Sequence, residues 1–139
     1  MASDAGACEV PTRIGKLFEN LARDGGKALI AYLTAGDPSL DATPALVEAL
    51  VRGGADLIEL GVPFSDPVAD GPVIQRAGER ALRAGATLAG VLEAARRIRD
   101  HSEVPLLLFT VMLSKNALNV PALLEGAPLN PMLPVSCDR

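Results

Sequence analysis

The stretch that decides the fold is Ala55 to Val62, "ADLIELGV", together with the loop "PFSDPVADGP" that follows it at 63–72. The first eight residues form an apolar run of the kind that a buried parallel strand carries. Glu59 interrupts that run, because it places an ionisable carboxyl group in the middle of the strand. The loop adds two more carboxylates, Asp66 and Asp70, and its prolines and glycine favour a shaped connection over a floppy one.

The sequence on both sides of this stretch alternates helical and strand patterns. Apolar residues recur at helical spacing in four segments, at 12–24, 43–52 (with Thr43 as its N-cap), 72–84 and about 87–99. Continuous apolar runs at 28–34 and 104–110 predict two further strands. Strands separated by helices are typical of right-handed βαβ units with a parallel sheet, so we expect an α/β fold.

Composition narrows the class of protein. The 139 residues suffice for one domain, and 49% apolar with 22% charged residues fits neither a disordered chain nor a membrane protein. The net charge of −4, without a basic cluster, argues against nucleic acid as a partner. No secretory signal or membrane-spanning run is visible, so we expect a cytoplasmic protein. Cys8 and Cys137 lack metal-ligand spacing, so we expect free thiols and no metal site.

Glu59 is the first candidate for chemistry. Strand alternation places Leu57, Glu59 and Gly61 on one face, and parallel sheets are usually covered on both faces. Burial would raise the pKa of Glu59 well above its usual value of about 4.3. Acid–base groups of α/β enzymes lie near the carboxyl ends of parallel strands, as Glu59 does. The alternative is a structural glutamate paired with an arginine or lysine of a neighbouring element.

The two loop aspartates allow structural interpretations. Asp70 stands just before a helix start, where an aspartate taken alone most often caps the helix opened by Gly71 and Pro72. Asp66, in "FSDP", favours a turn. The single histidine, His101, follows a predicted helix end and is expected to be solvated there. The sequence offers neither a Ser-His-Asp set nor a glycine-rich dinucleotide motif.

The stretch "IELGVPFSDPVADGP" (58–72) closely resembles the signature of the tryptophan synthase alpha subunit family, and "YLTAGDP" (32–38) is similar to that family's first strand and turn. The resemblance covers roughly residues 13–110 and implies a TIM (β/α)8 barrel. Because three strands are recognisable, we expect the N-terminal portion of such a barrel, truncated after about three strands. Residues 1–110 would form this partial domain, and 111–139 a divergent, irregular tail.

The resemblance also implies a function. The family is a lyase of tryptophan biosynthesis that cleaves indole-3-glycerol phosphate, by a retro-aldol reaction, to indole and glyceraldehyde 3-phosphate. Glu59 matches its catalytic glutamate, and Asp70 matches the catalytic loop aspartate that holds the indole N–H. Tyr32 falls where the family places an aromatic ring against the indole. The family needs no cofactor of its own; pyridoxal phosphate is expected only in the beta subunit, its partner in a heterotetramer of two alpha and two beta chains.

Two further functions stay open at this point. A complete barrel has eight strands and about 250 residues, and its phosphate site comes from the loops after strands seven and eight, which argues against activity of this chain as it stands. The chain would then be a non-catalytic fragment that binds a beta-like subunit through the loop at 63–72. The other alternative is a different barrel lyase acting on another phosphorylated substrate, against which Ser65-Asp66-Pro67 argues.

Overall fold

The structure is a computed structural model that describes residues 12–68 and 70–110. These residues form helices and strands in the predicted order, namely α1 (Arg13–Asp24), β1 (Ile30–Thr34), α2 (Thr43–Arg52), β2 (Leu57–Gly61), α3 (Pro72–Arg83), α4 (Leu88–Arg99) and β3 (Leu106–Phe109). The strands make one parallel sheet in the order β1-β2-β3. The prediction of an α/β fold built from βαβ units is therefore confirmed. The predicted tail at 111–139, Cys8 and Cys137 lie outside the described residues.

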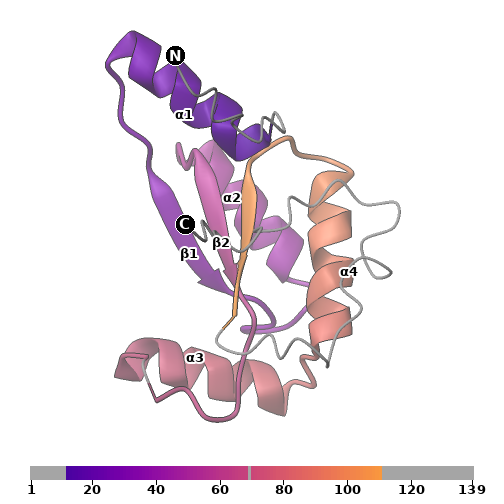
Figure 1. Cartoon of the computed structure of the whole chain (residues 1–139). Coiled ribbons are helices and arrows are strands. Elements are labelled where there is room, and N and C mark those ends of the chain that lie inside the picture. The colour runs from indigo at the N-terminus through magenta and orange to yellow at the C-terminus, as the bar shows by residue number, and fades with distance from the viewer. Residues whose placement is uncertain (1–11, 69, 111–139) are drawn as a thin grey trace, which may run out of the picture.

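The core lies between the sheet and two helices. Ile58 and Leu60 of β2 have no exposed surface and pack in one cluster with residues of α2 and α4, among them Val47, Val91 and Ile98. Burying each such side chain contributes on the order of 1.5–3 kcal/mol. In Figure 1, α2 lies behind the strands and α4 beside them, while α3 lies at the end toward which the strand arrows point and α1 at the opposite end.

The strand register determines which residues lie on the sheet face opposite Ile58 and Leu60. Tyr32 of β1 pairs with Glu59 of β2, which pairs with Leu107 of β3. Glu59 is half-buried, so the expectation of full burial is wrong. The reason is that α2 and α4 both pack on the face of Ile58 and Leu60, and within the described ranges no helix belongs to a matching core cluster on the Glu59 face.

Helix α1 begins and ends as its sequence predicts, whereas α2 does not begin with the predicted cap. The Thr12 hydroxyl accepts from the Gly15 N–H (2.9 Å) at the start of α1, and Gly25 ends this helix with a φ of 67°. Thr43, predicted to cap α2, is instead its first residue. Its buried hydroxyl accepts from the Gly36 N–H (3.1 Å) and donates to the Ser39 carbonyl (3.0 Å), because the β1–α2 loop folds back on it.

The described residues hold no candidate for a membrane-spanning helix or for a metal-ion site. Across 12–68 and 70–110, no helix is long and apolar enough to cross a membrane. The same residues bring together no group of three or more histidine, cysteine or acidic side chains that could hold a metal ion.

Candidate active site

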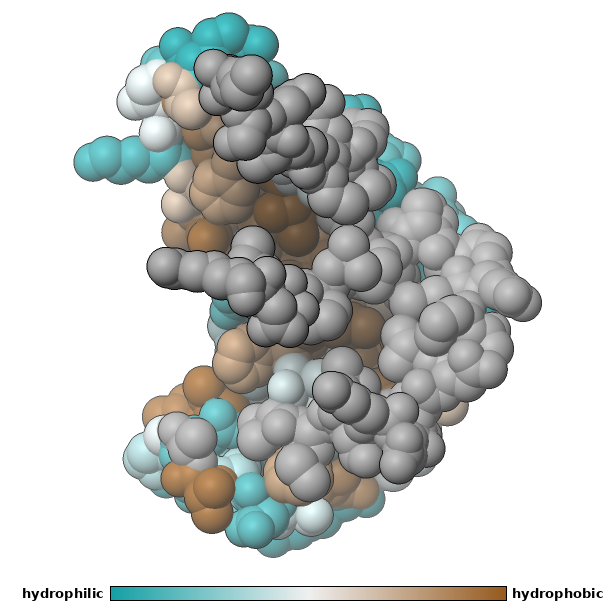
Figure 2. All heavy atoms as spheres, viewed as in Figure 1, coloured by the Kyte–Doolittle hydropathy of each residue, from teal (hydrophilic) through white to brown (hydrophobic). Residues whose placement is uncertain are grey.

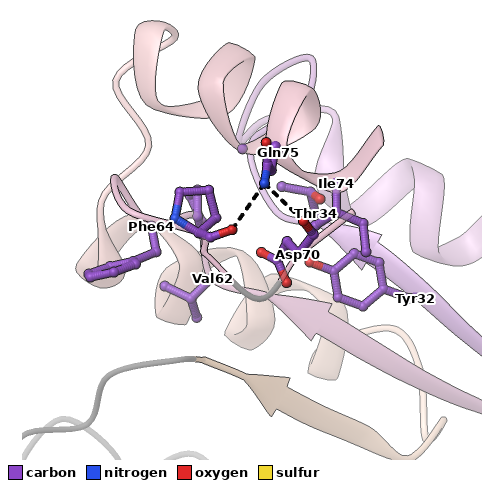
Figure 3. A pocket seen from close by; sticks show the side chains of 10 residues that line it. Tyr32, Thr34, Val62, Phe64, Asp70, Ile74 and Gln75 are labelled. Atoms are coloured by element: carbon purple, nitrogen blue, oxygen red, sulfur yellow. Dashed lines mark hydrogen bonds between the residues drawn. The ribbon is translucent and has the colours of Figure 1, made fainter. Parts of the chain in front are cut away.

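A small hollow lies at the carboxyl ends of β1 and β2, closed on one side by α3 (Figure 3). This edge of a parallel sheet is where α/β proteins bind ligands. The lining comes from three places in the chain: β1, the β2–α3 connection and the first half of α3. The lining residues are Tyr32, Thr34, Val62, Pro63, Phe64, Pro67, Asp70, Ile74, Gln75 and Gly78. Two of the predicted site residues, Tyr32 and Asp70, therefore meet in one hollow.

Glu59 lies on the sheet beside this hollow and does not line it. Its register partner is Tyr32, so the two side chains leave the sheet on the same face. No hydrogen bond or ion pair to the Glu59 carboxylate occurs in the described part of the chain. The structural interpretation, which requires an arginine or lysine partner, finds none there.

Tyr32 forms an aromatic wall between the hollow and the sheet. Its ring lies over Gly61, where an added Cβ would come within 2.6 Å of the Tyr32 Cζ atom. Beyond Gly61 the ring meets Phe109 of β3 edge-on, with centroids 6.1 Å apart and an interplanar angle of 85°. Sequence reasoning did not assign this role to Gly61. A glycine inside an apolar strand is the signal that could have found it, because such a glycine often marks a close approach.

Asp70 does not cap helix α3. The cap position belongs to Gly71, and no side chain bonds the free N–H groups there. The backbone of Asp70 is held at both ends: its N–H donates to the Pro67 carbonyl (3.1 Å), and its carbonyl accepts from Gln75 Nε2 (2.9 Å). The capping interpretation is therefore wrong, and the Asp70 carboxylate is left to line the hollow.

The other two residues singled out from the sequence stay away from this hollow. Asp66 lies next to a turn, but the hydrogen bond there is made by its backbone carbonyl, which accepts from the Val68 N–H at 3.0 Å, and not by the carboxylate that the sequence suggested. His101 is exposed just beyond the end of α4, as predicted.

An ion pair that the sequence did not suggest fastens α3 to the sheet. Arg80 donates through Nε and Nη2 to both oxygens of Asp37, at 2.9 and 2.7 Å. The hydrogen bonds from Arg80 lower the pKa of Asp37 below its usual value. The pair joins the β1–α2 loop to the helix that carries Ile74, Gln75 and Gly78, so it stabilises one wall of the hollow. Nothing in the sequence signals it, because the partners lie 43 residues apart.

The family model and the protein sequences that match this chain carry the same description. The family model described as tryptophan synthase alpha chain matches residues 18–124. The tryptophan synthase alpha chain of Solibacter usitatus is 78% identical over 101 residues, which are 73% of this chain and 38% of that protein. The chain thus spans little more than a third of this curated relative.

Solved structures agree with the sequence matches. The alpha subunit from Legionella pneumophila superposes with a TM-score of 0.69 at 45% identity, over 71% of this chain and 38% of that one. The tryptophan synthase a2b2 complex of Pyrococcus furiosus gives 0.57 at 46% identity, over 60% and 35%. These neighbours are TIM barrels, so the prediction that the described residues are part of such a barrel is confirmed.

Proposed function

The chain belongs to the tryptophan synthase alpha chain family, and from this premise we propose that its described residues carry the acid–base and ring-binding part of a lyase site. The reaction would be cleavage of indole-3-glycerol phosphate to indole and glyceraldehyde 3-phosphate, within tryptophan biosynthesis. The observation that carries the proposal is the arrangement of three residues. Glu59 lacks a pairing partner in the described residues and lies in register with Tyr32, whose ring shares a hollow with Asp70.

In the proposed reaction Glu59 moves the protons. Its carboxyl group protonates indole C3, which leaves an indolenine with positive charge at the ring nitrogen. Glu59, now a carboxylate, takes the proton of the hydroxyl group next to the breaking bond. The oxygen electron pair then forms the aldehyde, and the electrons of the C3–C1′ bond return to the ring and restore aromatic indole. A half-buried carboxyl group suits both transfers, because it is shielded from bulk water yet reachable by substrate.

Asp70 and Tyr32 would bind the ring. An ionised Asp70 accepts the indole N–H and stabilises the positive charge that develops on that nitrogen. Tyr32 offers an aromatic surface that is already held in place by Gly61 and Phe109, so little side-chain freedom is lost when the ring binds. None of these steps needs a cofactor, and we propose none for this chain.

A second candidate function is docking to a tryptophan synthase beta subunit, the chain that would carry pyridoxal phosphate. Two exposed valines beside the hollow favour it. Val68 of the β2–α3 connection is 82% exposed, and Val73 of α3 is 70% exposed. Exposed aliphatic side chains next to a site are suited to a protein contact. A relative of known structure is described as an a2b2 complex, which fits this partner.

Both candidates can be tested with one set of proteins. The chain and its Glu59→Gln and Asp70→Asn variants would be incubated with indole-3-glycerol phosphate, with and without a tryptophan synthase beta subunit, and indole would be measured. Glu48→Gln is the matched control, because Glu48 pairs with Arg52 on α2 away from the hollow. Indole release that Glu59→Gln abolishes supports the lyase. Release that survives this change contradicts it, and beta-subunit retention without any release favours docking.

A further inference from the structure

The side chain of Gln75 ties the β2–α3 connection to helix α3 (Figure 3). Its Nε2 lies 2.9 Å from the Asp70 carbonyl oxygen and 3.2 Å from the Pro67 carbonyl oxygen. The Pro67 carbonyl also accepts the Asp70 N–H, at 3.1 Å. One amide group therefore holds both carbonyls of the turn that presents the Asp70 side chain.

The backbone of Gln75 is held within helix α3. Gln75 lies in the first turn of α3, and its own N–H donates to the Gly71 carbonyl at 3.0 Å. The side chain is half-buried, so its hydrogen bonds compete less with water than those of an exposed glutamine. A path of hydrogen bonds thus leads from the helix through Gln75 to the backbone of Asp70.

The Asp70 carboxylate depends on that backbone for its position. Within 12–68 and 70–110 no hydrogen bond or ion pair reaches the carboxylate itself, and its side chain does not cap α3. The conformation of the main chain then sets the direction in which the Cα–Cβ bond of Asp70 leaves the turn, and with it the region of the hollow that the carboxylate can reach. Small displacements of such a group weaken recognition of a donor strongly, since hydrogen bonds require both distance and alignment.

We propose that Gln75 is a positioning residue for Asp70, which orients the carboxylate toward a bound ring that carries an N–H donor. Gln75 does not touch the ring in this proposal and acts only through the backbone of the turn. The part that concerns ring recognition rests on the proposed function, whereas the part that concerns the turn rests on the hydrogen bonds alone.

The test uses the full chain and two measurements. Gln75→Met removes the amide at nearly constant volume, and Arg76→Met, an exposed neighbour on the same helix, is the matched control. Amide hydrogen exchange at Val68 and Asp70, whose N–H groups bond within the turn, reports the order of the turn. We expect exchange there to rise about tenfold in Gln75→Met, the effect of losing one net hydrogen bond, and to stay unchanged in Arg76→Met. Gln75→Asn, which keeps the amide on a shorter stem, should behave like Gln75→Met and replaces it if that variant does not fold.

The second measurement compares indole with benzothiophene, an isostere without the N–H. Indole fluorescence is readily followed because the chain contains no tryptophan. We expect the parent chain to prefer indole, and Gln75→Met to lose this preference about tenfold while benzothiophene affinity stays the same. A merely structural role would weaken both ligands together.

The two measurements together separate the role of Gln75 in the turn from its effect on ring binding. Unchanged amide exchange overturns the role of Gln75, whatever the ligands do. Faster exchange with an intact preference for indole overturns the claim that Gln75 acts through Asp70. Faster exchange in Gln75→Met, with no preference for indole even in the parent chain, supports Gln75 as the anchor of the turn and counts against the proposed function instead.

Discussion

The ring of Tyr32 lies over Gly61, so a side chain on β1 reaches across β2 to meet Phe109 on β3. The register makes this possible, because Gly61 pairs with Thr34 on one side and with Phe109 on the other. A residue with any side chain at position 61 would occupy the space that the ring fills. The absence of a Cβ at one strand position thus sets the aromatic wall of the hollow.

Gly61→Ala tests this relationship. A Cβ there would lie 2.6 Å from Cζ and 2.9 Å from Cε2 of Tyr32, which forces the ring away from Phe109. We expect a loss of about 1–3 kcal/mol in the free energy of unfolding, as for other overpacked sites. Tyr32 is the one tyrosine of a chain without tryptophan, so its near-ultraviolet circular dichroism should also fall.

Gly78→Ala is the control for that change. An added Cβ at position 78 meets no atom within 4 Å, and alanine favours a helix more than glycine by up to about 1 kcal/mol. This variant should keep the tyrosine signal and gain stability slightly. An equal loss of signal in both variants would contradict the packing of Tyr32 on Gly61.

Glu59→Gln separates a catalytic glutamate from a structural one. Since the described residues give its carboxylate no ion pair, we expect the free energy of unfolding to change by less than about 0.5 kcal/mol, as at sites without specific partners. The structural alternative predicts a loss of about 3–5 kcal/mol, the cost of breaking a buried pair. Urea unfolding of the two proteins at neutral pH measures the difference. A loss in the larger range would restore the structural interpretation.

Local patterns in the sequence were sufficient for the elements, whereas the site needed the tertiary structure. Apolar spacing predicted α4 and the β2 strand, because each depends on residues close in sequence. The expected burial of Glu59 failed because it assumed helices over both faces of the sheet. The prediction that Asp70 caps α3 was wrong because the turn is held by hydrogen bonds of the Asp70 backbone. One of the donors is the side chain of Gln75, which no sequence motif indicates. The ion pair of Arg80 with Asp37 joins segments that only the fold brings together.

That ion pair predicts a pH dependence of stability. The pKa of Asp37 is lower in the folded chain than in the unfolded chain, chiefly because Arg80 donates hydrogen bonds to its carboxylate. The stability that the ionised Asp37 contributes is therefore fully present above the pKa of the unfolded chain, about 3.9. It disappears as the pH falls through the lower pKa of the folded chain. We expect Asp37→Asn to destabilise the chain at pH 7 and to differ little from the parent once Asp37 is protonated.

Unfolding by urea at several values between pH 7 and pH 2.5 gives this comparison. Asp41→Asn is the matched control, because Asp41 also pairs with an arginine, Arg97, but its side chain is 91% exposed. Exposed pairs contribute little, so this variant should follow the parent at every pH. A stability difference for Asp37→Asn that does not shrink as the pH falls below about 3.9 would show that the ion pair is not its source.

Thr43→Val tests the loop that joins β1 to α2. The Thr43 side chain has no exposed surface, and its hydroxyl is the acceptor for the Gly36 N–H at 3.1 Å. Valine keeps the shape but leaves that buried N–H without its partner, so we expect a loss of about 1–3 kcal/mol in the free energy of unfolding. Thr43→Ser keeps the hydroxyl and removes only a methyl group, which should cost about 1 kcal/mol. Because the loop also carries Asp37, the valine variant should weaken the pH dependence described above, and a valine variant as stable as the serine variant would contradict the hydrogen-bonding role of Thr43.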